Sequence, residues 1–283
     1  MVDRSGAARQ PPRGGPRRRR LLRVWTIGLT PVLLIAAVLL APAVRQRLSG
    51  TGSRSAPAGP VLLVSGYGGA TSSLQLMAAR LRAAGRQVLI VPPVGDNTGD
   101  LREQARELDR VAREQVGAGA ASVDVVGYSA GGVVARIWAA ELGGAAVARR
   151  VVTLGSPHHG TDVAQLAAGV LAAGCPTACR QLASSGELVR GLQEAPSGPH
   201  WTSVWTADDD LVLPPDSARL SGAVDVELQQ VCADSRVSHS GLPTDPLTIG
   251  LVLRALGGAG LSAAPAAGEC TALRADGGGA VSS

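Results

Sequence analysis

One stretch of sequence, residues 122–142, constrains the fold of this 283-residue chain more than any other. It begins with a short apolar run that includes Val123, Val125 and Val126, which is typical of a buried β-strand. The segment GYSAGG, residues 127–132, interrupts this run. Apolar residues then recur at helical spacing as far as Leu142. The sequence therefore predicts a strand, a tight turn with Ser129 at its apex, and a helix.

In that setting the pattern G-x-S-x-G is typical of a nucleophile elbow, a strained turn that exposes a serine hydroxyl. Gly127 and Gly131 would have to be small so that the strand and the helix can approach each other. The backbone N–H of Ala130 would point to the place where negative charge forms on a reacting carbonyl oxygen. A glycine-rich turn without any catalytic role is the alternative interpretation.

Apolar runs alternate with helical patterns along most of the chain. The expected strands, besides 123–126, are 60–64, 88–91, 150–154, 202–206 and 224–228. Helices are expected from Thr71 or Ser72 to Gly85, from Asp96 to Val116 and from Asp245 to Leu256. Residues 161–200 are rich in Ala and Gly and have only a weak helical pattern. This order predicts an α/β fold whose mostly parallel sheet is covered by helices on both faces.

A serine nucleophile needs a base that takes its proton, and four histidines are available. In folds with a nucleophile elbow the order along the chain is Ser, acid, His. His158 and His159 come before a suitable acid, and His200 precedes a strand and would lie at the wrong end of the sheet. His239 lies between the last strand and the last helix, where the general base is expected.

The acid that orients this base is expected in the loop after strand 202–206, which contains Asp208, Asp209 and Asp210. Asp209 is favoured because an apolar pair, Leu211-Val212, follows it closely and would help to bury its carboxylate. Asp162, in the loop after the preceding strand, is the alternative.

The loop after the first strand, Gly66-Tyr67-Gly68-Gly69, suits a second donor to the oxyanion, because glycines let the backbone approach a ligand closely. We predict that the N–H of Tyr67 is this donor. An ordinary glycine-rich turn is the alternative.

The N-terminus predicts export. Residues 1–23 hold eight of the 27 basic residues and one acid, whereas the rest of the chain has a formal charge of −2, which argues against a nucleic-acid site. Residues 24–44 are uncharged and long enough to cross a bilayer, and the preceding arginines predict a cytoplasmic N-terminus. This segment is either a membrane anchor, which we favour, or a signal peptide cut after Ala43.

Four cysteines fit an oxidising compartment. Cys175 and Cys179 are close enough in sequence for a disulfide, which would leave Cys232 to pair with Cys270. Three pairings are possible, and four buried thiols are a further alternative. No His accompanies these cysteines at zinc spacing, so no metal site is predicted.

The predicted organisation has five parts. Residues 1–23 form a basic tail, 24–44 the membrane or signal segment, and 45–58 a flexible linker. Residues 59–258 form the catalytic domain, in which 161–200 is a possible lid, and residues 259–283 are expected to be a loose tail.

Five segments together resemble the α/β-hydrolase lipases and esterases, especially small secreted bacterial triacylglycerol lipases. They are VLLVSGYGG, VVGYSAGG, VTLGSPHHGT, TADDDLVLPPDSARL and SHSGLPTDP, within residues 60–256. The resemblance implies an α/β-hydrolase fold, a triad of Ser129, Asp209 and His239, and an oxyanion hole formed by Tyr67 and Ala130. The family usually has His-Gly where this chain has Ser65-Gly66.

The expected function is therefore hydrolysis of a lipid or other carboxylic ester, without a metal or cofactor. An acyltransferase that uses the same triad, and an inactive domain that binds a lipid or a partner, are the alternatives. We expect a monomer that contacts its ester or lipid substrate and, through the N-terminal segment, a membrane.

Overall fold

The computed structural model describes residues 57–170 and 174–279. The basic tail 1–23, the predicted membrane or signal segment 24–44 and most of the predicted linker lie outside the described residues. Among the residues described, no helix is both long enough and apolar enough to span a bilayer.

A six-stranded parallel sheet forms the centre of the described domain, in the order β2-β1-β3-β4-β5-β6. All six strands that the sequence predicts are present. Their bounds are β1 (Val61–Val64), β2 (Val88–Ile90), β3 (Val123–Tyr128), β4 (Ala148–Leu154), β5 (His200–Trp205) and β6 (Val224–Glu227). Because all strands are parallel, their carboxyl ends meet along one edge, where the loops that follow them are brought together.

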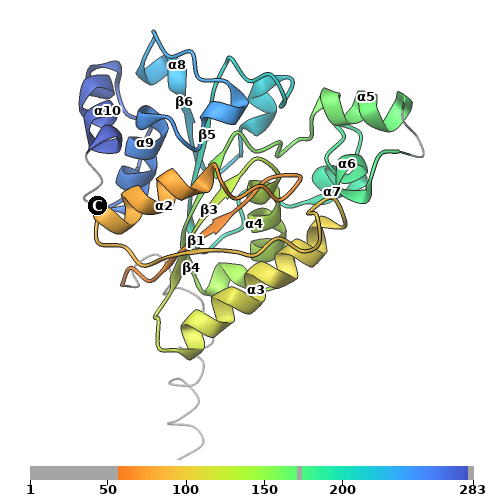
Figure 1. Cartoon of the computed structure of the whole chain (residues 1–283), viewed down its shortest axis with the longest axis horizontal. Coiled ribbons are helices and arrows are strands. Elements are labelled where there is room, and N and C mark those ends of the chain that lie inside the picture. Colours follow the sequence, from red (N-terminus) through yellow and green to blue (C-terminus); the bar gives the residue numbers. More distant parts are fainter. Residues whose placement is uncertain (1–56, 171–173, 280–283) are drawn as a thin grey trace, which may run out of the picture. The chain divides into compact units, whose positions relative to one another are not determined.

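Helices cover both faces of this sheet (Figure 1). One face carries α3 (Leu101–Gly117) and α4 (Ala130–Glu141). The other carries α2 (Leu74–Ala83), α9 (Pro246–Leu256) and α10 (Cys270–Gly278). Alternate residues of each strand enter the two cores: Leu62 and Val64 of β1 face α3 and α4, whereas Val61 and Leu63 face the opposite layer.

Residues 161–192 form a separate group of short helices, which we call the cap: α5 (Asp162–Val170), α6 (Thr177–Gln181) and α7 (Glu187–Gly191). Figure 1 shows them together at the side of α4, away from α2, α9 and α10. Residues 171–173 of the predicted lid lie outside the described part of the chain.

Two helix boundaries differ from the prediction. The helix expected from Asp96 begins at Leu101, because the Asp96 carboxylate instead accepts from the N–H and hydroxyl of Thr98 in a local turn. Asp100 caps the helix, since its side chain accepts from the N–H of Arg102. The first helix begins after Ser73, without a side-chain cap from Thr71 or Ser72.

The prediction of a loose tail over residues 259–283 is wrong for residues 267–278. A 3₁₀ turn (Ala267–Glu269) leads there into helix α10. Leu273 of α10 is fully buried, and the backbone of α10 packs so closely on α9 that a Cβ at Gly250 would lie 2.0 Å from the Leu273 oxygen. A disulfide joins Cys270 to Cys232. The burial of Leu273 and the disulfide order this segment. Its Ala/Gly-rich sequence lacks the apolar periodicity from which a helix could be predicted.

Candidate active site

Ser129 lies in a sharp turn between β3 and α4. Its backbone has φ 54° and ψ −125°, a region that non-glycine residues rarely occupy. The turn depends on glycines on both sides. A Cβ at Gly131 would lie 2.4 Å from the oxygen of Val64, and one at Gly127 would lie 2.5 Å from the oxygen of Gly131. The predicted strand, strained turn and helix are thus present, with Ser129 at the apex.

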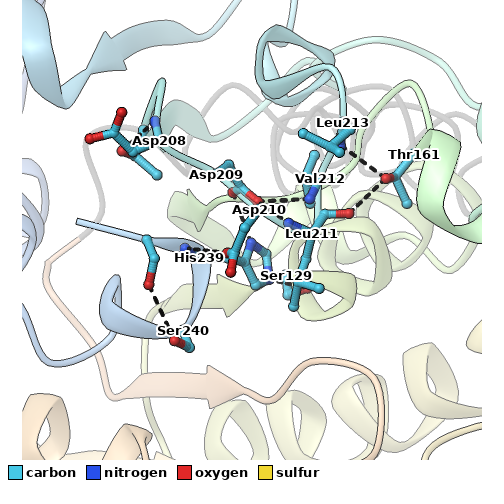
Figure 2. A network of polar contacts seen from close by, with 12 residues as sticks. Ser129, Thr161, Asp208, Asp209, Asp210, Leu211, Val212, Leu213, His239 and Ser240 are labelled. Atoms are coloured by element: carbon cyan, nitrogen blue, oxygen red, sulfur yellow. Dashed lines mark hydrogen bonds and ion pairs between the residues drawn. The ribbon is translucent and has the colours of Figure 1, made fainter. Parts of the chain in front are cut away.

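The structure brings Ser129, His239 and Asp209 into one hydrogen-bonded chain (Figure 2). The Nε2 atom of His239 lies 2.9 Å from the Ser129 hydroxyl, and its Nδ1 atom lies 2.8 Å from Oδ2 of Asp209. His239 and Asp209 are only 2% and 6% exposed. Ser129 directly follows β3, and Asp209 and His239 lie in the segments that follow β5 and β6, so the parallel sheet brings all three to one edge.

The Asp209 carboxylate is held by its own loop. Its second oxygen, Oδ1, accepts from the backbone N–H groups of Leu211 at 3.0 Å and Val212 at 2.7 Å. Val212 is buried, as the sequence argument for Asp209 requires, whereas Leu211 is exposed. Two backbone donors and the imidazole therefore fix the orientation of this carboxylate.

The other acids considered from the sequence lie elsewhere. Asp208 is exposed. Asp210 is exposed but accepts from the backbone N–H of His239 at 3.3 Å. Asp162 accepts from the Ser184 hydroxyl at 2.8 Å, within the cap.

Tyr128 is a contact of the base that the sequence did not predict. Its hydroxyl donates to the backbone oxygen of His239 at 3.3 Å, and the two rings lie 5.2 Å apart between centroids. Burial first, and then the carboxylates of Asp209 and Asp210, raise the pKa of Tyr128 to about 12. The hydroxyl is therefore protonated, and able to donate, at neutral pH.

The predicted oxyanion donors lie beside Ser129. Ala130 is the first residue of α4, so its N–H has no acceptor within the helix. Gly66 is packed against the nucleophile: a Cβ there would lie 2.9 Å from the Cβ of Ser129. Tyr67 follows Gly66 and lines the same cavity as Ser129. The buried side chain of Asn97 fixes this loop, because its amide donates to the Gly66 oxygen at 2.8 Å.

Comparison with protein-family models and with curated proteins finds no match. Solved structures do match. Lipase B of Aspergillus fumigatus superposes with a TM-score of 0.60 and 19% identity, over 72% of this chain and 53% of its own. The mature lipase BlEst2 of Bacillus licheniformis has a TM-score of 0.59 and 19% identity, over 70% of this chain and 91% of its own. This chain thus spans about half of the fungal lipase.

The chain has the α/β-hydrolase fold. At this level of identity the likeness establishes the fold, and it agrees with the resemblance seen in the five sequence segments. What a protein with this fold acts on has to be argued from its own residues.

A cavity of about 300 Å³ opens beside Ser129. Ser129 and His239 are among the residues that line it, and most of the others are apolar. They come from the loops after β1, β4 and β5 and from the cap: Tyr67, Pro157, Leu211, Val212, Thr161, Val163, Ala164, Ala167, Gly174, Cys175, Pro176, Cys179 and Leu182. The cavity therefore offers an apolar ligand a place next to the nucleophile.

Two parts of the cap are attached to the rest of the domain differently. Helix α6 is tied to the start of α3: the Gln181 amide donates to Asp100 at 2.7 Å and accepts from the N–H of Leu101 at 2.9 Å. Its Ala178 is fully buried. Helix α5, in contrast, has no buried residue, and its Leu166 and Val170 are 68% and 71% exposed.

The four cysteines form two disulfides, Cys175–Cys179 and Cys232–Cys270. The first lines the apolar cavity. Among the described residues, one group of metal-binding side chains lies within mutual reach, Cys232, Asp234 and Cys270, and its two cysteines are the disulfide pair.

His158 and His159 are structural. His158 is fully buried, and its Nε2 lies 3.0 Å from the Thr153 hydroxyl. Burial, together with the neighbouring charges of Arg136 and His159, lowers the pKa of His158 well below 6.5. His159 lies 2.9 Å from the carboxylate of Glu194, away from Ser129.

Proposed function

We propose that the protein is a serine carboxylester hydrolase that acts on esters with an apolar acyl group. The observation that carries this proposal is the hydrogen-bonded chain Ser129–His239–Asp209 beside an apolar cavity. A serine hydroxyl is a weak nucleophile near neutral pH, and an imidazole oriented by a carboxylate is what activates it. The lipases that share the fold are consistent with an ester as substrate.

In the proposed reaction the Ser129 oxygen attacks the ester carbonyl carbon while its proton passes to Nε2 of His239. The negative charge on the carbonyl oxygen is stabilised by the N–H groups of Tyr67 and Ala130. The C–O bond of the ester then breaks, and the alcohol leaves with the proton from His239. Water attacks the acyl-enzyme by the same route, with His239 as the base, and releases the carboxylic acid.

Labelling with a fluorophosphonate probe and turnover of nitrophenyl esters test this proposal. We expect Ser129→Ala to abolish labelling and to reduce kcat by at least about 10³-fold, because the nucleophile is lost. Ser221→Ala, at an exposed serine, is the control and should behave as the wild type. Labelling or turnover that survives in Ser129→Ala would contradict the proposal.

The acyl group is proposed to lie against the cap. Ala167 lines the cavity, whereas its neighbour Ala168 does not. Ala167→Phe should therefore reduce kcat/KM for an octanoate ester by about 10-fold or more and affect an acetate ester much less, since filling the cavity excludes the longer chain. Ala168→Phe is the matched control on the same helix. An equal effect of both variants on the two esters would place the acyl group elsewhere.

We infer further that the catalytic domain works outside the cytoplasm. Its two disulfides support this, because disulfides persist in oxidising compartments. Proteolysis of intact cells, followed by N-terminal sequencing of the protein, would distinguish an anchored chain from one cut after Ala43. A protein found in the cytosol with four free thiols would contradict the inference.

A further inference from the structure

Thr161 connects the first turn of the cap with the loop that carries Asp209. It directly precedes α5 and is 7% exposed. Its hydroxyl donates to the backbone oxygen of Leu211 at 2.7 Å and accepts from the backbone N–H of Leu213 at 3.0 Å. Figure 2 shows Thr161 facing the acid loop through these two contacts.

These two hydrogen bonds join Thr161 to the residues on either side of Val212, whose backbone N–H orients the Asp209 carboxylate. Val212 lies between Leu211 and Leu213, and its N–H donates to Oδ1 of Asp209 at 2.7 Å. The Leu211–Val212 peptide unit serves both sides, because its N–H, that of Val212, donates to Asp209 and its oxygen, that of Leu211, accepts from Thr161. The Thr161 hydroxyl is therefore bonded to the peptide unit that orients the carboxylate, and also to the next peptide unit along the chain.

The side chains of the acid loop provide little other anchoring. Leu211 and Leu213 are 49% and 37% exposed, so their burial fixes the loop only weakly, and Val212 alone is buried. The N–H of Asp162 adds one more bond, to the Leu213 oxygen at 2.7 Å. Between the acid and the cap, the Thr161 hydroxyl is thus the side-chain group that fixes the position of this backbone.

We propose that Thr161 is a positioning residue for Asp209. Through Thr161, the alignment of the Asp209 carboxylate with His239 depends on where the cap begins, at the start of α5. The inference rests on the proposed function, because it concerns the same triad. Thr161 touches no reacting atom in this role. It acts through the peptides of Leu211 and Val212 on the carboxylate, and the carboxylate acts on the imidazole.

The test compares three variants of the full chain, using a nitrophenyl acetate substrate too short to sense the cavity wall. Thr161→Val keeps the shape of the side chain but removes the hydroxyl. We expect kcat to fall about 10- to 100-fold with KM changed less than about 3-fold, because a small displacement of a catalytic group is costly while binding is untouched. Thr161→Ser retains the hydroxyl and should restore most of kcat. Thr202→Val, at a buried threonine within β5, is the control and should leave kcat unchanged.

A double-mutant cycle with Asp209→Asn separates positioning from general damage. If Thr161 acts through Asp209, Thr161→Val should lower kcat by less than about 2-fold in the Asp209→Asn background, because the group that it positions is already lost. Losses that multiply in the double variant would overturn the proposal. So would a Thr161→Ser variant that is folded yet as slow as Thr161→Val.

The outcomes also separate this inference from the proposed function. A wild type with neither labelling nor ester turnover would overturn both. An active wild type together with Thr161→Val at full kcat would overturn the role of Thr161 alone. Melting temperatures show whether Thr161→Val is folded. If Thr161→Val is not folded, the wild type is compared with Thr161→Ser and Thr161→Ala instead. Equal kcat in these three proteins would overturn the proposal.

Discussion

The hydroxyl of Tyr128 lies 3.3 Å from the backbone oxygen of His239. The residue that precedes the nucleophile therefore supports the backbone of the base. The His239 N–H, which belongs to the preceding peptide unit, donates to Asp210 at 3.3 Å. Both backbone groups of His239 are thus bonded to side chains from elsewhere in the fold, one at the end of β3 and one in the loop after β5, which limits the movement of the imidazole relative to Ser129.

Removal of the Tyr128 hydroxyl should slow the reaction without abolishing it. We expect Tyr128→Phe to lower kcat by about 2- to 10-fold, because a hydrogen bond of this kind is worth about 0.5–1.5 kcal/mol. Tyr128→Leu also removes the ring that contacts His239 and should cost more. Steady-state kinetics on an acetate ester checks the order. Equal rates for wild type and both variants would contradict a role of Tyr128 in holding the base.

The turn around Ser129 should not tolerate a methyl group at Gly131. A Cβ there would meet the backbone oxygen of Val64 at 2.4 Å, and backbone of a central strand cannot easily move. Gly131→Ala should destabilise the protein by about 1–3 kcal/mol or more and abolish turnover. Gly117→Ala, at the end of α3 where a Cβ has open space, is the matched control and should stabilise by about 0.5–1 kcal/mol. Thermal unfolding measures both.

Acid should destabilise the fold through His158. Because its pKa is lowered in the folded state, the unfolded chain binds a proton that the folded chain does not. Stability is therefore full above about pH 6.5 and falls as the pH drops below it, at up to about 1.4 kcal/mol per pH unit from this residue. In His158→Gln the free energy of unfolding, measured with urea, should therefore fall less between pH 7 and pH 5 than in the wild type. His159→Gln is the control. An unchanged pH dependence in His158→Gln would contradict the prediction.

The two disulfides should differ in their effect on stability. Cys232–Cys270 spans 38 residues and Cys175–Cys179 only 4. The loss of loop entropy in the unfolded chain predicts about 4 kcal/mol for the first and about 2 kcal/mol for the second. Paired Cys→Ser variants, compared by denaturant unfolding, test the order. A larger loss from the Cys175–Cys179 pair would show that folded-state contacts, rather than loop length, dominate.

The central strands were predictable from sequence because they are β-branched, apolar runs buried on both sides, as Val151 and Val152 illustrate, and β6 was predictable because apolar and acidic residues alternate along it. The start of α3 was not, since Asp96 and Asp100 are both suitable caps and only the turn made with Thr98 decides between them. Helix α10 was missed because what orders it, the burial of Leu273 and the bond to Cys232, depends on contacts distant in sequence.

The same division applies to the candidate site. Ser129, Asp209 and His239 could be selected because their order along the chain and their places after strands follow from the elbow and the parallel sheet. Asn97, Tyr128 and Thr161 could not, because each acts on the backbone of a loop far away in the sequence. Any residue can supply the backbone group that such a side chain bonds to. The sequence of the distant loop therefore contains no motif that would indicate the contact.

Helix α5 lines the cavity but buries none of its own side chains. Substitutions along it, apart from the preceding Thr161, therefore carry little cost in folding free energy. The sheet, the turn at Ser129 and helix α6 have no such freedom, because their side chains or backbones are packed. Under the proposed function α5 contacts the acyl group, so the segment that would select among esters is also the one in which substitutions cost least in stability. Changes in substrate range are therefore expected to arise there first, both in natural evolution and in the laboratory.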